Sequence, residues 1–302
     1  MFRFPYRTFL LLALPCLLSG CFRRWAMSER EITAHYASRP VKPRFVTIEN
    51  DSVRLFCASV GADTLPPLLL IHGAPGAWYG YLRMLDDSLL QRHYNLISVD
   101  RPNYGKSRKR RHRTITSIDR QAHAIALALS ANRSGRPALV LGRSFGAPIA
   151  ARLAMLYPDK VRHLVMVAPA IDPDREKFWW FSGWARFPLV QLFLPRQLNT
   201  ATAEKYSHVK ELKKLTPHWP QLRVPTTILQ GGKDWIVDPA NLDFARRQLA
   251  GKDTEFFILP EAGHLITSSH PSLVRELLLR CTDEPLPGGG AELSTVADKA
   301  PY

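Results

Sequence analysis

The sequence of 302 residues has only four cysteines, and no cysteine or histidine spacing in it resembles a metal site. Acidic residues are also scarce, since 41 lysines and arginines outnumber 26 aspartates and glutamates, which gives a net charge of +15. Despite this charge, no module typical of nucleic-acid binding is visible. We therefore expect no metal, no cofactor and no nucleic-acid partner.

The N-terminal hydrophobic run is too short to cross a bilayer. Arg3 and Arg7 precede the run Phe9-Leu10-Leu11-Leu12-Ala13-Leu14, a pattern typical of a secretory signal. The segment ends at Leu18-Ser19-Gly20-Cys21, which resembles the lipobox of bacterial lipoproteins. That resemblance implies that residues 1–20 are removed and that Cys21 is lipidated, with palmitate among its acyl chains.

Export and membrane anchoring follow from this resemblance. Phe22 is not the aspartate associated with inner-membrane retention, so we expect the outer membrane, facing the periplasm. An ordinary signal peptide with a chance cysteine is the alternative. An exported compartment would permit a disulfide between Cys57 and Cys281, but two buried free thiols are favoured because Cys57 lies within an apolar run.

The remaining sequence divides into three parts. Residues 21–43 are expected to be a tether, residues 44–282 a single domain with one sizeable core, and residues 283–302 a disordered tail. The tail contains Pro285, Pro287 and the triplet Gly288-Gly289-Gly290, with few large apolar residues.

The domain alternates strands and helices after an opening hairpin at residues 45–48 and 53–56. Continuous apolar runs predict further strands at residues 67–71, 95–99, 138–141, 164–167, 226–229 and 255–259. Such runs are typical of a parallel sheet covered on both faces, which makes the fold class α/β with a mostly parallel central sheet flanked by helices. The long interval from about residue 171 to 222 predicts an inserted helical cap.

A candidate nucleophile follows the run at 138–141. The motif Gly142-Arg143-Ser144-Phe145-Gly146 leads into an alanine-rich helical segment, which is typical of a nucleophile elbow. Its glycines leave room for a sharp turn that exposes the Ser144 hydroxyl, and the N–H of Phe145 can face a developing oxyanion.

Other polar loops follow the other predicted strands, so all of them lie at one edge of the sheet. The first two are His72-Gly73-Ala74-Pro75-Gly76 and Asp100-Arg101-Pro102-Asn103-Tyr104-Gly105-Lys106-Ser107, and Asp234 and His264 follow later strands. Together with the elbow, and in the order Ser, Asp, His, these motifs resemble the α/β-hydrolase family over most of the chain. The resemblance implies a capped α/β-hydrolase fold and serine hydrolase activity.

The catalytic roles follow from chemistry and from the resemblance. Ser144 needs a base, and His264 occupies the position that the family uses, whereas the rival His72 resembles a residue that shapes the oxyanion loop. A buried carboxylate must orient the imidazole, and Asp234 is the best candidate, with Asp172 and Asp238 as alternatives.

The oxyanion hole would combine the N–H groups of Phe145 and Ala74. The expected reaction forms an acyl-enzyme on Ser144, which water then hydrolyses. A serine at this position argues against the epoxide hydrolase and haloalkane dehalogenase branches of the family, because these use aspartate.

Two features bear on the substrate. The aromatic cap, with Trp179 and Trp180, suggests either an apolar substrate group or simple packing of the cap onto the sheet. A basic run consists of Lys106, Arg108, Lys109, Arg110, Arg111 and Arg113. This run begins at the active-site edge and could contact anionic lipid head groups.

Three hypotheses remain open. The first is a membrane-tethered serine hydrolase acting on hydrophobic or lipid-like carboxylic esters. The second is a peptidase similar to proline iminopeptidases, with Glu176 or Glu204 binding a substrate ammonium. The third is a non-catalytic lipoprotein that binds envelope components through its basic face.

Overall fold

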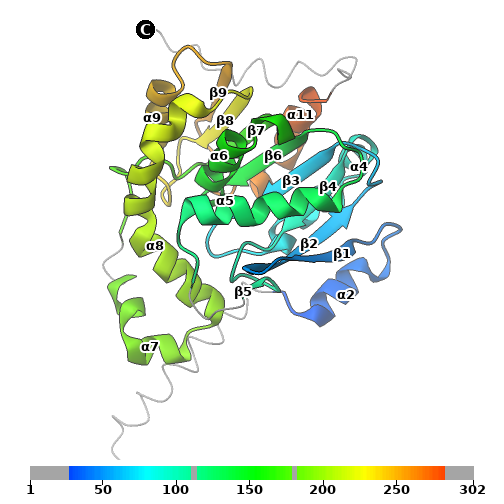
Figure 1. Ribbon diagram of the computed structural model, residues 1–302, viewed down its shortest axis with the longest axis horizontal. Coiled ribbons are helices and arrows are strands. Elements are labelled where there is room, and N and C mark those ends of the chain that lie inside the picture. The colour runs from blue at the N-terminus through cyan, green and yellow to red at the C-terminus, as the bar shows by residue number, and fades with distance from the viewer. Residues whose placement is uncertain (1–26, 110–113, 179–181, 283–302) are drawn as a thin grey trace, which may run out of the picture.

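The computed structural model describes residues 27–109, 114–178 and 182–282, and its centre is a nine-stranded sheet (Figure 1). The strands are β1 Arg44–Glu49, β2 Val53–Val60, β3 Pro67–Ile71, β4 Asn95–Val99, β5 Arg108–Lys109, β6 Ala138–Arg143, β7 Val161–Val167, β8 Thr226–Gly231 and β9 Thr254–Leu259. Their order across the sheet is β1-β2-β4-β3-β6-β7-β8-β9, and β5 pairs with the beginning of β2.

The sheet is antiparallel only at its first edge. β1 pairs antiparallel with β2, and β2 pairs antiparallel with β4, whereas β3, β4 and β6 to β9 run parallel. The opening hairpin and the mostly parallel α/β sheet predicted from the apolar runs are therefore confirmed. Parallel pairing also places the carboxyl ends of these strands at one common edge.

Ten α-helices and five 3₁₀ helices occur in the described residues. The α-helices are α2 Glu29–Ala37, α3 Leu82–Leu85, α4 Ser88–His93, α5 Ile118–Ala126, α6 Gly146–Leu156, α7 Pro188–Phe193, α8 Arg196–Leu215, α9 Asn241–Gln248, α10 Ile266–Ser269 and α11 Pro271–Arg280. The 3₁₀ helices are η1 Trp78–Tyr81, η2 Leu127–Ala131, η3 Pro158–Lys160, η4 Ser182–Arg186 and η5 Thr216–Gln221.

Helices cover both faces of the sheet, α5 and α6 on one face and α4 and α11 on the other (Figure 1). Successive residues of β3 point to opposite faces, so Leu69 packs in the cluster with α5 and α6 while Leu70 packs in the cluster with α11. Every residue of β3 is buried. Burial on both faces explains why the strand is apolar throughout rather than alternating.

The segment expected to be a tether contains a helix, α2. The Ser28 hydroxyl accepts a hydrogen bond from the N–H of Glu31, whose carboxylate accepts one from the N–H of Ser28. This capping box satisfies backbone groups at the helix start. Ile32 and Tyr36 are buried in the cluster that contains α11. Part of residues 21–43 is thus attached to the folded domain.

The long interval between β7 and β8 is helical, as expected for an inserted cap. It contains η4, α7, α8 and η5, and α8 runs along one side of the sheet with α7 beyond it (Figure 1). Residues 179–181, which include Trp179 and Trp180, lie outside the described residues. The exposed fractions of Trp184, Phe187 and Phe193 are 62%, 59% and 63%, so these aromatic side chains do not pack onto the sheet.

Cys57 and Cys281, the cysteines within the described residues, are free thiols. Cys57 lies in the cluster with α5 and α6, whereas Cys281 packs against the cluster on the other face of the sheet. Burial raises the pKa of both thiols above the ordinary value, that of Cys281 to about 12. The preferred prediction of unpaired thiols therefore agrees with this structure.

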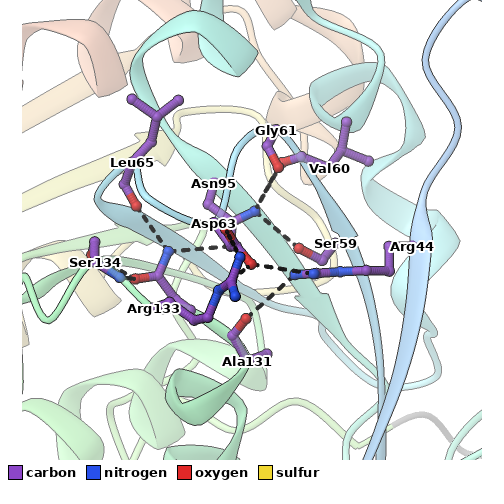
Figure 2. A network of polar contacts seen from close by, with 11 residues as sticks. Arg44, Ser59, Val60, Gly61, Asp63, Leu65, Asn95, Ala131, Arg133 and Ser134 are labelled. Carbon is purple, nitrogen blue, oxygen red and sulfur yellow. Dashed lines mark hydrogen bonds and ion pairs between the residues drawn. The ribbon is translucent and has the colours of Figure 1, made fainter.

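A polar network joins segments at the amino ends of the parallel strands (Figure 2). Asn95, the first residue of β4, donates hydrogen bonds to Ser59 Oγ at 3.0 Å and Gly61 O at 3.1 Å. Nearby, Asp63 accepts from Arg133 Nε at 2.8 Å and from Arg44 Nη1 at 3.3 Å. These bonds lie at the edge opposite the predicted site, so they connect strands without involving catalytic groups.

No helix in the described ranges is both long and apolar enough to cross a membrane. The expected signal peptide and Cys21 lie outside these ranges, as do Arg110, Arg111 and the expected tail at residues 283–302.

Candidate active site

Ser144 lies on a sharp turn between β6 and α6. Its φ of 54° is in the left-handed region, which costs a non-glycine residue roughly 1–2 kcal/mol. The turn is held by hydrogen bonds from Ser144 N to Val167 O at 2.9 Å and from Ala147 N to Ser144 O at 3.0 Å. This is the conformation expected of a nucleophile elbow.

The two glycines of the elbow are required by close packing. A Cβ on Gly146 would lie 2.4 Å from Ile71 O, and one on Gly142 would lie 2.6 Å from Ala150 Cβ. A Cβ on Gly73 would lie 3.1 Å from the Ser144 Cβ, which shows how closely the loop after β3 approaches the serine. The glycines therefore allow α6, β3 and the elbow to pack together.

Asp234 and His264 form a hydrogen-bonded pair. The His264 Nδ1–H donates to Asp234 Oδ2 at 2.7 Å, because an ionised carboxylate can only accept. The other carboxylate oxygen accepts from the N–H groups of Ile236 and Val237, both at 2.9 Å. Asp234 is buried, and these three bonds fix its orientation. The pair thereby leaves His264 Nε2 available to exchange a proton.

The loops that hold this pair pack against each other. Lys233 N donates to Ala262 O at 2.9 Å, and a Cβ on Gly231 would lie 2.5 Å from the same oxygen. Gly231 therefore allows the loop after β8 to approach the loop after β9, so that Asp234 reaches His264.

The alternative residues have other partners. His72 is fully buried, and its Nδ1 and Nε2 are bonded to Gly73 O and to the N–H of Arg101, so it has no free nitrogen for proton transfer. Asp172 Oδ1 accepts from Asp174 N, and Asp238 Oδ1 accepts from Ala240 N. Both carboxylates thus stabilise local turns.

Ala74, Ser144 and Phe145 line one pocket that opens to solvent. Phe145 is the N-cap residue of α6, so its N–H has no partner within the helix and lies at the positive end of the helix dipole. Ile236 and Val237, whose N–H groups hold Asp234, line the same pocket. The predicted nucleophile, the predicted oxyanion residues and the acid loop thus meet there.

The Ser144 hydroxyl makes no hydrogen bond to His264 within the described part of the chain. Such bonds are often long in free enzymes and shorten when substrate binds. The structure therefore brings Asp234 and His264 into direct contact and places Ser144 beside the loop that holds Asp234.

The pocket wall is more polar than the aromatic cap suggested. Besides Ser144, three alanines and the larger apolar residues Phe145, Ile236 and Val237, it contains Asp172, Arg175, Glu176, Lys177, Lys205, His208 and Asn241. The aromatic residues Trp184, Phe187 and Phe193 do not line it. The expectation that cap aromatics contact the substrate is therefore not met by these three residues.

Glu176 and Glu204, the two candidates for ammonium binding, are already paired. Glu176 accepts from Lys205 and, at 2.6 Å, from His208 Nδ1. Burial opposes its charge, but the interactions with His208 and Lys205 outweigh that effect and lower the pKa of Glu176. Glu204 is fully buried and bonded to Arg101 and Tyr104.

Sequence reasoning gave no role to Arg101 or His208. Arg101 is fully buried beneath the oxyanion loop, and the His208 ring stacks on Phe145 with centroids 4.2 Å apart. The sequence did contain one indication of a role for Arg101, because this residue belongs to a loop at the active-site edge. The partners of both residues lie far away in sequence, so their contacts could not be inferred from the motif.

The fold and this site define a hydrolase of the α/β class. A model of the alpha/beta hydrolase fold family matches residues 66–216, half of the chain. The chain therefore belongs to the alpha/beta-hydrolase fold family.

Individual relatives are distant. The chain is 22% identical to mouse epoxide hydrolase 4 over 282 residues, covering 78% of this chain and 77% of that protein. It superposes on a bacterial membrane phospholipase A with a TM-score of 0.60 and 20% identity, covering 90% and 93% of the two chains. It also superposes on 2-hydroxy-6-oxo-6-phenylhexa-2,4-dienoate hydrolase from Rhodococcus sp. strain RHA1, with a TM-score of 0.63, 15% identity and coverages of 80% and 98%.

Proposed function

We propose that this protein is a membrane-tethered serine hydrolase that cleaves carboxylic esters, with hydrophobic or lipid-like esters as substrates. One observation carries the proposal: a buried, hydrogen-bonded Asp234–His264 pair occurs at the same sheet edge as a serine on a strained strand-to-helix turn. These are the parts of a catalytic triad, which activates the serine hydroxyl when the hydroxyl and the histidine come into hydrogen-bond contact.

The reaction proceeds through an acyl-enzyme. Ser144 Oγ attacks the ester carbonyl carbon while His264 Nε2 takes the hydroxyl proton, and Asp234 stabilises the imidazolium. The N–H groups of Phe145 and Ala74 hold the oxyanion. When the tetrahedral intermediate breaks down, the ester C–O bond breaks and His264 gives its proton to the departing alcohol.

Water completes the cycle. It attacks the acyl carbon and transfers a proton to His264, after which the Ser144 oxygen leaves and regains its proton from the imidazolium. The carboxylic acid is released. The overall reaction is hydrolysis of the ester to an alcohol and a carboxylic acid, and it requires no oxidant or cofactor.

The serine distinguishes this chain from its epoxide hydrolase relatives. In that branch, which the sequence resembles, an aspartate occupies the nucleophile position. Ser144 supports ester cleavage instead, since an acylated serine is released by water through the same histidine.

The exposed apolar face of the cap supports the proposal that the substrate is drawn from a hydrophobic phase such as a membrane. Its apolar residues are largely exposed, with Leu189 at 70% and Leu192 at 79%. Arg196, at the start of α8, donates to the backbone oxygens of Gly105 and Ser107, so this face adjoins the start of the basic run. An apolar face beside basic residues is typical of contact with anionic membranes.

The pocket itself suits the polar scissile ester group of such a substrate rather than its hydrocarbon part. Charged side chains of Arg175, Lys177 and Lys205 line it together with Ser144. A lipid-like substrate would therefore place its scissile ester in the pocket, while its hydrocarbon part remains near the exposed cap face.

The aminopeptidase alternative is less favoured by this geometry. A substrate ammonium needs an unpaired carboxylate, and both Glu204 and Glu176 already have cationic partners. The non-catalytic alternative gives no reason for the Asp234–His264 pair or for the strained Ser144.

Labelling with a fluorophosphonate tests the serine hydrolase proposal. Wild-type protein is expected to be labelled at Ser144, and Ser144→Ala is expected to take no label and to hydrolyse no ester. A panel of p-nitrophenyl esters of different chain lengths, run beside aminoacyl substrates, then identifies the preferred bond. An unlabelled wild-type protein would contradict the proposal.

Tethering is tested separately. Labelled palmitate is expected to be incorporated into the wild-type protein and not into Cys21→Ser, and the wild-type protein should remain in the membrane fraction after a high-salt wash. Incorporation into Cys21→Ser, or its retention after the wash, would count against anchoring through Cys21.

A further inference from the structure

Arg101 connects three separate parts of the fold. Its side chain is fully buried. Nη1 donates to Gln121 Oε1 and Glu204 Oε1, both at 2.7 Å, and Nη2 donates to Glu204 Oε2 and Gly73 O, both at 3.0 Å. One guanidinium therefore joins the loop after β3, helix α5 and the cap helix α8.

The contact with Gly73 acts on the oxyanion loop. Gly73 O and the N–H of Ala74 belong to one planar peptide group and point in opposite directions when it is trans. Fixing the carbonyl thus fixes the direction of the N–H. The positive charge on Arg101 also polarises the peptide, which strengthens the Ala74 N–H as a donor.

His72 fixes the same peptide from a second side. The N–H of Arg101 donates to His72 Nε2 at 3.0 Å, so the ring proton is on Nδ1, which donates to Gly73 O at 2.7 Å. Burial, reinforced by the charge of Arg101, lowers the pKa of His72 well below its ordinary value. The ring therefore stays neutral and keeps this tautomer.

Glu204 holds Arg101 from the cap. Its carboxylate is fully buried and also accepts from Tyr104 Oη at 2.6 Å and Gln121 Nε2 at 2.8 Å. Burial opposes the charge on Arg101, but Glu204 outweighs this effect and the pKa of Arg101 is raised. Arg101 therefore stays charged, and the two hydrogen bonds to Glu204 on α8 keep its guanidinium beneath the oxyanion loop.

The cap contacts the second expected oxyanion donor as well. His208, four residues after Glu204 and on the same face of α8, stacks on the Phe145 ring. The Arg101 guanidinium carbon lies 5.1 Å from the centre of that ring. The Gly73–Ala74 peptide, through Gly73 O, and the Phe145 ring thus both contact the Arg101–α8 assembly.

We propose that Arg101 and Glu204 are positioning residues that couple the cap helix to the oxyanion hole, so that the Ala74 amide points at the substrate only while α8 is docked. This inference rests on the proposed serine hydrolase function. It gives the buried ion pair a role in transition-state stabilisation beyond its role in holding the cap.

The decisive variant is the double substitution Arg101→Met with Glu204→Leu. Replacing both members of a buried pair with apolar residues usually preserves folding, whereas removing one member does not. For a folded double variant we expect kcat to fall by about 10²-fold or more, the usual effect of losing one oxyanion donor, with a much smaller change in KM. Affinity for an alkyl boronic acid, which mimics the tetrahedral intermediate, should fall in parallel.

A matched control is Arg152→Met with Asp119→Leu. This pair, 2.8 Å apart, joins α5 to α6 without touching the oxyanion loop. Its removal should alter thermal stability and leave kcat nearly unchanged. If the folded Arg101/Glu204 double variant also keeps its kcat and its boronic acid affinity, the coupling is absent and the pair is only structural.

Glu204→Gln is a second variant, and its thermal unfolding is measured first because it leaves the buried charge of Arg101 without its counter-charge. It keeps the shape and some hydrogen bonds of the carboxylate but removes its charge, and we expect kcat to fall by roughly tenfold with KM little changed. An unchanged kcat in folded Glu204→Gln would overturn the proposal. Fluorophosphonate labelling of the wild-type protein distinguishes failure of the proposed function from failure of this inference. If the wild-type protein is not labelled, both fail together. If it is labelled and the folded double variant is fully active, only the inference fails.

Discussion

At the residue scale, the strained backbone of Ser144 is maintained by its neighbours. Gly142 and Gly146 have no Cβ, so β6 and α6 approach each other and β3 closely enough to hold a φ of 54° at the serine. The strain exposes the hydroxyl at the carboxyl edge of the sheet. Tight packing around the elbow is therefore a condition of the expected chemistry.

Gly146→Ala is expected to disrupt this packing. Its Cβ would meet Ile71 O at 2.4 Å, and backbone must shift to relieve the clash, so we expect a loss of roughly 1–3 kcal/mol in unfolding free energy and loss of fluorophosphonate labelling. Chemical denaturation and labelling measure the two effects. Gly80→Ala is the control, since its nearest atom would be 3.8 Å away; comparable losses in both variants would contradict the packing argument.

Asp234→Asn tests which carboxylate orients His264. An amide cannot replace the carboxylate that stabilises the imidazolium, so kcat should fall by roughly 10³- to 10⁴-fold while the fold is retained. Asp172→Asn is the matched control, because Asp172 lies at the pocket but bonds to Asp174 rather than to His264. A larger loss of kcat in Asp172→Asn than in Asp234→Asn would reverse the assignment.

The residues that sequence reasoning identified share one property. Ser144, Asp234 and His264 each follow an apolar strand, so a parallel sheet brings them to one edge whatever the details of packing. Arg101 also follows such a strand, but its importance depends on Glu204, 103 positions later. A buried arginine can be recognised only when its partner is known, and the motif does not reveal that partner.

At the element scale, α8 is unusual because its buried face is largely polar. Thr200, Glu204, His208 and Glu211 are buried along one side of the helix, where a core helix would present apolar residues. Without an apolar stripe, the sequence predicted a cap but not how the cap attaches. Because the cap is attached through charged contacts, we expect the stability of this attachment to depend on pH.

Among these cap residues, Glu176 is the one whose contribution to stability has a pH dependence of known direction. Because its pKa is lowered below the ordinary value of 4.5 by His208 and Lys205, its charge stabilises the fold above pH 4.5, and this stabilisation is lost as pH falls through the lowered pKa. At neutral pH, Glu176→Gln should cost about 1–3 kcal/mol, or a few degrees in Tm. The difference in Tm from wild type should shrink as pH is lowered from 7 to 3.

Glu261→Gln is the control for this titration. Glu261 pairs with Lys233 on the surface, with 80% of its side chain exposed, and exposed pairs contribute little to stability. Its Tm difference from wild type should stay near zero at every pH. A difference for Glu176→Gln that is constant between pH 7 and 3 would show that the carboxylate charge does not hold the cap.

At the scale of the whole molecule, the apolar residues of the cap face outward. Trp184, Phe187, Leu189, Leu192 and Phe193 are all more than half exposed along η4 and α7. Soluble monomers rarely expose a contiguous apolar patch of this kind without a partner. The net charge of +15 adds attraction to anionic surfaces, so the proposal that this chain contacts a membrane surface can be tested at the cap.

A vesicle-binding assay distinguishes the contribution of the cap face from that of the lipid anchor. It uses the chain from residue 22 onward, which lacks the expected lipid. Burying an exposed leucine in the interface is worth up to about 1.5–3 kcal/mol, so Leu192→Gln should weaken binding to phosphatidylglycerol vesicles by roughly tenfold or more. Leu189→Gln should behave similarly, whereas Val41→Gln, an exposed apolar residue outside the cap, should not. Equal binding by all four proteins in a sedimentation assay would exclude α7 as the membrane-facing element, and membrane binding would then depend on charge and on Cys21.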